Sequence, residues 1–118
     1  GGVKICRLIN GMGQEDSKDG VWSDKMETLR TMERFVDEGF TTFHLGGPIK
    51  AARDRSEEWA GAFFKSVRKE GSGETVQFLT DIGFRPDIPV TKKAVIAAVD
   101  SSLRRMGKER LDLVQLNW

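Results

Sequence analysis

Residues 91–116 read TKKAVIAAVDSSLRRMGKERLDLVQL and combine two kinds of apolar spacing. The first part has apolar residues at steps of three or four, namely Ala94, Val95, Ala98, Val99 and Leu103. This spacing predicts a helix that Thr91 caps and Gly107 ends. Residues 111–116 form a short apolar run, which predicts a strand. A helix that leads directly into a strand is the unit of parallel α/β folds.

The same kind of unit precedes this one along the chain. The predicted elements are a strand over 3–9, a helix from a Ser23 cap to Gly39, a strand over 40–45, a helix from Ser56 to Gly71 and a strand over 75–80. The order is therefore β-α-β-α-β-α-β in one domain over residues 1–118, with parallel strands and right-handed crossovers. Such an order fits a small open sheet or part of a closed barrel. The order of elements alone does not decide between the two; a full barrel needs about 250 residues, so in that case this chain would be half of one.

Composition narrows the function classes. The chain has 118 residues and a net charge of +1, which argues against a nucleic-acid-binding module. No apolar run approaches the roughly 18 residues of a membrane span. The single Cys6 excludes an internal disulfide and a cysteine zinc site, and the single His44 leaves no histidine pair for a metal. The chain begins with Gly1, so we expect a removed leading segment or a longer parent chain.

Four stretches resemble one known family. Residues 101–107, SSLRRMG, followed by DLVQLNW at 112–118, resemble the aldo-keto reductase pattern S-L-x-R-L-G and D-L-V-Q-L-H-W. Residues 38–43, EGFTTF, and 56–61, SEEWAG, resemble two further motifs of that family. Residues 7–12, RLINGM, are similar to the first strand of a branch common in photosynthetic organisms. The resemblance implies the N-terminal half of a (β/α)8 TIM barrel.

The resemblance also implies four catalytic positions, all of which are replaced here. The family reduces carbonyls with NADPH through a tyrosine that donates a proton, an aspartate and a lysine that tune its acidity, and a histidine that orients the carbonyl. The replaced positions, in that family's order aspartate, tyrosine, lysine and histidine, are His44, Ile49, Asp81 and Asn117. The chain contains no tyrosine at all. Losing general-acid catalysis typically costs 10²–10⁴-fold in rate.

We therefore expect no catalytic residue, cofactor site or metal site in this chain, with NADP bound only if a C-terminal half supplies its contacts. The leading hypothesis is a catalytically inactive structural or assembly subunit of a larger protein complex. The alternative is a fragment of a divergent NADP-dependent reductase, and a weaker third possibility is a domain that binds a small ligand in the old pocket. His44 and Asp81 are candidates for an ion pair across the top of the barrel.

A half barrel leaves two sheet edges open, so we expect a protein partner to cover them. The candidate interface residues are Trp59, Lys50, Arg53, Arg55 and Trp118. Tryptophan is enriched at interface hot spots, and the basic run is expected in a loop that could dock an acidic surface. We expect neither a nucleic-acid partner nor a membrane span. The resemblance of the first strand implies an organelle, the chloroplast.

Overall fold

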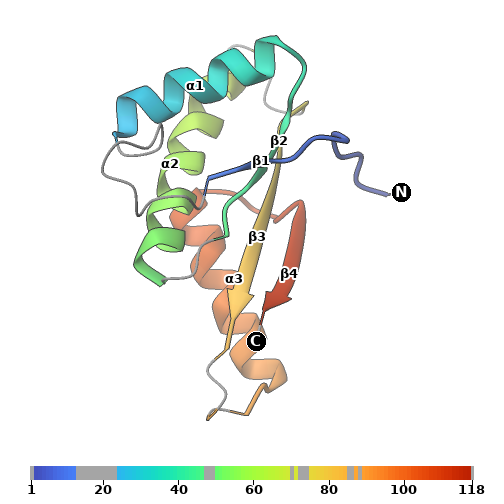
Figure 1. Ribbon diagram of the computed structural model, residues 1–118. Coiled ribbons are helices and arrows are strands. Elements are labelled where there is room, and N and C mark those ends of the chain that lie inside the picture. The colour runs from blue at the N-terminus through green and yellow to red at the C-terminus, as the bar shows by residue number, and fades with distance from the viewer. Residues whose placement is uncertain are drawn as a thin grey trace.

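The computed structural model describes residues 2–12, 24–46, 50–69, 71, 75–84, 87 and 89–117. It contains one four-stranded sheet with the strands in sequence order. The strands are β1 (Asn10–Gly11), β2 (Thr42–His44), β3 (Gln77–Gly83) and β4 (Leu113–Asn117), and every neighbouring pair is parallel. The helices α1 (Lys25–Asp37), α2 (Lys50–Lys69) and α3 (Lys92–Met106) connect them (Figure 1). The predicted half-barrel topology is confirmed.

Local signals in the sequence fix where the helices begin and end. The Thr91 hydroxyl accepts a hydrogen bond from the backbone N–H of Ala94 at 3.2 Å and caps α3 as predicted. Gly107 ends α3 with a φ of 63°, a conformation that glycine adopts without strain. The N-cap of α1 is Asp24, one residue beyond the predicted Ser23, because its carboxylate accepts from the N–H of Glu27. Ser23 lies outside the described residues.

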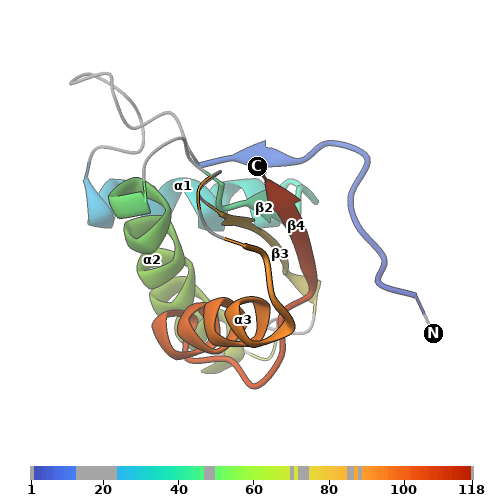
Figure 2. The same cartoon turned by 90° about the horizontal axis from the view of Figure 1, so that it is seen from below.

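The hydrophobic core lies between the helices and the sheet, with residues of all three helices in it. Phe43 of β2 packs edge-on against Phe63 of α2, with ring centroids 6.1 Å apart, and Phe78 of β3 lies beside both. Helix α2 contacts α1, α3 and β3, and α2 and α3 lie along one side of the sheet (Figure 2). Strand β3 lies between β2 and β4 in the sheet, and five of its seven residues are buried. The buried polar side chains of β3 therefore need hydrogen-bond partners within the protein.

The first predicted strand is largely wrong. Only Asn10 and Gly11 pair with β2, whereas residues 3–9 form no ladder. The Asn10 side-chain amide donates to the Phe40 carbonyl at 3.4 Å and to the Thr42 carbonyl at 3.2 Å. The parallel register would assign the Phe40 carbonyl to the N–H of Leu8. The Asn10 side chain thus ends the ladder that the apolar run suggested.

The predicted start of the second helix lies too late in the sequence. Helix α2 begins at Lys50 and not at Ser56, so the basic run expected in a loop forms its first turns. Alanine, lysine and arginine favour helix in this run, and Lys50 pairs with Asp54 one turn later. Ser56 lies inside the helix, and its hydroxyl donates to the carbonyl of Ala52 at 3.0 Å. Similarly, β3 continues to Gly83, beyond the predicted end at Thr80, because Ile82 pairs with Leu116 of β4.

Candidate functional site

His44 and Asp81 meet at the carboxyl ends of β2 and β3. His44 Nε2 lies 2.9 Å from Asp81 Oδ1, so the predicted pair across the top of the half barrel is confirmed. The Asp81 side chain is only 10% exposed, whereas the His44 side chain is 34% exposed. The pair forms because residues 44 and 81 both point away from the helix-covered face, as the alternation along a strand requires. A nearly buried carboxylate is thereby satisfied by a partly exposed ring.

Gly46 leaves the space that this pair occupies. A Cβ built on Gly46 would lie 2.6 Å from two atoms of the His44 ring and would overlap the Asp81 carboxylate. Gln115 of β4 is the register partner of Asp81 on the other side. The chain after β2 thus approaches the pair closely, and a side chain at position 46 would force the His44 ring or the Asp81 carboxylate to move.

An open cleft of about 340 Å³ lies next to Asp81, between α2, α3 and the end of β3. Lys50, Arg53 and Arg105 supply cationic side chains to it. Lys50 contacts Asp54, and Arg105 Nε contacts Glu57 Oε2 at 2.5 Å. Among the described residues that line this cleft, Arg53 is the cation for which no carboxylate contact is found.

Of the other residues predicted for the interface or the catalytic positions, Trp59, Arg55 and Asn117 are described by the structure. Trp59 is half-buried on α2, and the Arg55 guanidinium lies 5.8 Å from the centroid of its ring. Asn117 is exposed at the end of β4, where its carbonyl accepts from the N–H of Phe84 at 3.2 Å. Ile49 and Trp118 lie outside the described residues.

A fully buried carboxylate, Glu57, was missed by the sequence reasoning. It accepts hydrogen bonds from the Thr80 hydroxyl at 2.5 Å, the Ser102 hydroxyl at 2.8 Å and Arg105 Nε at 2.5 Å. These partners come from β3 and α3, so one side chain of α2 joins three elements. The signal lay in the helix pattern, since Glu57 falls on the apolar side of α2 with Ala60 and Phe63. Its role is structural, because the carboxylate is fully enclosed.

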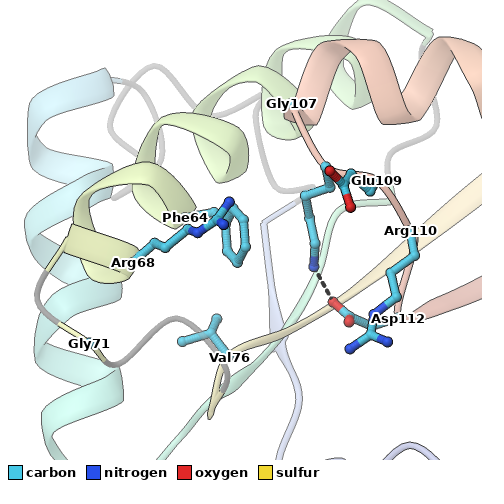
Figure 3. A pocket seen from close by; sticks show the side chains of 9 residues that line it. Phe64, Arg68, Gly71, Val76, Gly107, Glu109, Arg110 and Asp112 are labelled. Carbon is cyan, nitrogen blue, oxygen red and sulfur yellow. Dashed lines mark hydrogen bonds and ion pairs between the residues drawn. The ribbon is translucent and has the colours of Figure 1, made fainter.

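A second open cleft, of about 760 Å³, lies at the opposite, amino end of the strands (Figure 3). Phe64 and Arg68 of α2 border it on one side, and Asp112 lies on the other (Figure 3). Asp112 accepts from Lys108 Nζ at 2.6 Å and from the N–H of Phe78 at 3.0 Å. The polar groups of Asp112 are thus used to join the α3–β4 turn to β3.

No helix among the described residues is long and apolar enough to cross a membrane. No group of three or more His, Cys, Asp or Glu side chains in the described ranges is placed to hold a metal ion.

A comparison with models of known protein families shows to which family this chain is related. The model of the Aldo/keto reductase family matches residues 7–118, almost the whole chain. The chain belongs to the aldo/keto reductase family. A comparison with curated proteins finds no match. The parallel half-barrel sheet agrees with this family, whose barrel begins with the same alternation of strands and helices.

The dinucleotide implied by aldo/keto reductase membership does not fit the residues described. Each of its phosphates needs cationic side chains or free backbone N–H groups as partners. In the cleft beside Asp81, Lys50 and Arg105 already contact the carboxylates of Asp54 and Glu57. Arg53 is the remaining arginine of this cleft, and one cation is a poor match for a ligand with several negative charges.

Proposed function

We propose that this aldo/keto reductase family member does not reduce carbonyls by the family's tyrosine-dependent route and acts as a structural or assembly subunit of a protein complex. The observation that carries the proposal is the contact between His44 and Asp81 at 2.9 Å. In the arrangement that the resemblance implies, an aspartate and a lysine at these two positions act on a tyrosine. Here the two groups bind each other, and the chain has no tyrosine.

The chemistry of the pair supports inactivity in carbonyl reduction. Hydride transfer to a carbonyl leaves negative charge on its oxygen, which the active site must neutralise with a proton or a cation. A carboxylate such as Asp81 repels that charge. At the tyrosine position, Ile49 has no proton to donate, and Asn117 stands where a histidine would orient the carbonyl.

The exposed side of the fold supports a role in protein contacts. Every residue of β4 is exposed, including Leu113, Val114 and Leu116. Parallel strands are found almost always with both faces covered. An apolar strand with an uncovered edge can pair with a further polypeptide segment. The same proposal includes the chloroplast as location, which rests on the resemblance of residues 7–12 to a photosynthetic branch and is tested by organelle fractionation.

Two measurements test the proposed function. The first is NADPH oxidation by the purified chain with a panel of aldehydes and ketones, compared with the His44→Ala variant. We expect no rate above the protein-free background. A rate above background that falls in His44→Ala overturns the proposal and favours the divergent reductase. The second is the native size of the chain in its source extract, where we expect it in an assembly and not as a free monomer.

A further inference from the structure

The cleft at the carboxyl end of β3 is built from the interior of the sequence, residues 50–105. Strand β3 ends beside α3 there (Figure 1). Besides the cationic side chains, the lining includes Ile82 and Gly83 of β3 and Ala97, Ala98 and Ser101 of α3. The volume of about 340 Å³ lies near the lower end of the range of about 300–1,000 Å³ that is typical of small-molecule sites. The cleft therefore has room for a small organic molecule.

Of the three cationic side chains that line the cleft, two are paired and one is not. Lys50 contacts Asp54, and Arg105 contacts Glu57. The Arg53 guanidinium has neither a carboxylate nor a hydrogen-bond acceptor in contact with it in the described part of the chain. Arg53 is nevertheless half-buried, and an arginine keeps its charge at any physiological pH. Because a partly desolvated charge without a partner is unfavourable, a bound anion would stabilise it.

The Arg53 guanidinium lies against the end of β3. Its Nη1 atom is 3.4 Å from the place that a Cβ on Gly83 would occupy, so the missing side chain leaves space beside the guanidinium. The carboxylate of Asp81, two residues earlier, binds His44 on the other face of the sheet. The position next to Arg53 thus suits a ligand that brings one negative charge.

The rest of the lining offers one polar group and a short apolar surface. The Ser101 hydroxyl accepts a hydrogen bond from Arg105 Nη1 at 2.8 Å, and among the described residues no acceptor is found for its own proton. A hydroxyl can accept and donate at the same time, so it has a bond left for a ligand oxygen. Ile82, Ala97 and Ala98 carry only apolar side chains. The ligand therefore needs an anionic head and a short hydrocarbon part.

We propose that this cleft binds a small monocarboxylate, with its carboxylate on Arg53 and its hydrocarbon part against Ile82 and Ala98. A guanidinium binds a carboxylate through two parallel N–H···O bonds, a geometry that a lysine does not offer. One cation without a partner matches one negative charge, which favours a monocarboxylate over a phosphate or a dinucleotide. The proposal goes beyond the structural role proposed above, because this site depends neither on protein contacts nor on carbonyl reduction.

The first experiment is an NMR titration of the isotope-labelled full chain with acetate, butyrate, lactate and benzoate. We expect at least one acid to give saturable amide shifts at residues 82–83 and 97–101, with a Kd of about 1 mM or lower. The amide of that acid, which has the same shape without the charge, should bind about tenfold more weakly or worse. The proposal is overturned if none of the acids saturates, if the amide binds equally well, or if inorganic phosphate binds more tightly.

Variants of the cationic side chains test which group holds the carboxylate. Arg53→Ala should raise the Kd of the acid that binds by about tenfold or more. Arg53→Lys keeps the charge without the planar fork and should retain part of the affinity. Arg104→Ala is the matched control, because Arg104 is exposed on α3 and does not line the cleft. We expect its Kd to equal that of the parent chain.

A variant of the apolar lining tests the position of the hydrocarbon part. Ala98→Leu narrows the cleft without changing any charge and should also raise the Kd. Circular dichroism checks that each variant folds, and Ala97→Leu, at an exposed position of the same lining, replaces Ala98→Leu if the latter does not. Binding that neither Arg53→Ala nor the leucine variant weakens overturns the proposal. Carbonyl reduction by the parent chain would overturn the proposed function and leave these Kd values as they are.

Discussion

Gly61 of α2 lies directly against the backbone of Met106 at the end of α3. A Cβ built on Gly61 would come within 2.5 Å of the Met106 carbonyl oxygen and 2.8 Å of its carbonyl carbon. The two helices therefore approach each other more closely than any side chain at this position allows.

Gly61→Ala should consequently destabilise the fold. The added methyl group meets backbone atoms, which cannot turn aside as a flexible side chain would, so α3 must shift. We expect the free energy of unfolding to fall by about 1–3 kcal/mol in urea denaturation. Gly83→Ala is the control, since its Cβ would have only ordinary contacts, the nearest at 3.4 Å. Equal stability of Gly61→Ala and the parent chain would contradict the close packing.

Glu57→Ala should lower the free energy of unfolding more than Gly61→Ala does. It removes the acceptor of the Thr80 and Ser102 hydroxyls and leaves Arg105, which is 19% exposed, with only its longer contact to Asp54 Oδ1 at 3.5 Å. Breaking a buried ion pair from one side costs about 3–5 kcal/mol, a large fraction of the stability of a small domain.

The neighbouring Glu58 is exposed on the same helix and gives a matched control. Glu58→Ala should change the unfolding free energy by less than about 0.5 kcal/mol. Similar urea midpoints for Glu57→Ala and Glu58→Ala would show that the buried contacts of Glu57 contribute little.

Removing the cap of α3 should have a smaller and more local effect. Thr91→Ala loses the oxygen that accepts from the N–H of Ala94, and the expected loss is about 1 kcal/mol. Thr91→Ser keeps an oxygen at the same place and should retain most of the stability. Amide exchange in the first turn of α3 should accelerate in the alanine variant only. Acceleration in both variants would argue against the cap.

Asp112→Ala should destabilise the contact between β3 and the turn before β4. The N–H of Phe78 loses its acceptor, and Lys108, whose side chain is 7% exposed, loses its partner. We expect a loss of about 2 kcal/mol, because a buried donor without an acceptor costs about 1–3 kcal/mol. Hydrogen exchange at the Phe78 amide should rise. Asp112→Asn keeps an acceptor oxygen and should lose less; equal losses would point to the charge alone.

The sequence predicted the elements whose signals are local. Thr91 and Gly107 bounded α3 correctly, because a cap and a stop act within a few residues. The first strand failed because its end depends on the Asn10 amide reaching β2, a contact across about thirty residues that no spacing reveals.

The site was predicted as a set of positions more than as a geometry. Because parallel strands place their carboxyl ends together, the contact of His44 with Asp81 followed from the order of elements. The Glu57 network did not, since it needs α2, β3 and α3 to be packed before its partners become neighbours.

Thr80 and Asp81 are adjacent in β3 and serve opposite faces of the sheet. Thr80 donates to Glu57 among the helices, whereas Asp81 holds His44 on the other side. Sliding β3 by one residue would turn Asp81 toward the buried Glu57 carboxylate and set two negative charges together without water. The Thr80 hydroxyl and the Asp81 carboxylate thus fix the register of β3, because each group finds its partner in only one alignment of the strand. A chain with β3 out of register is destabilised during folding as well as in the final structure.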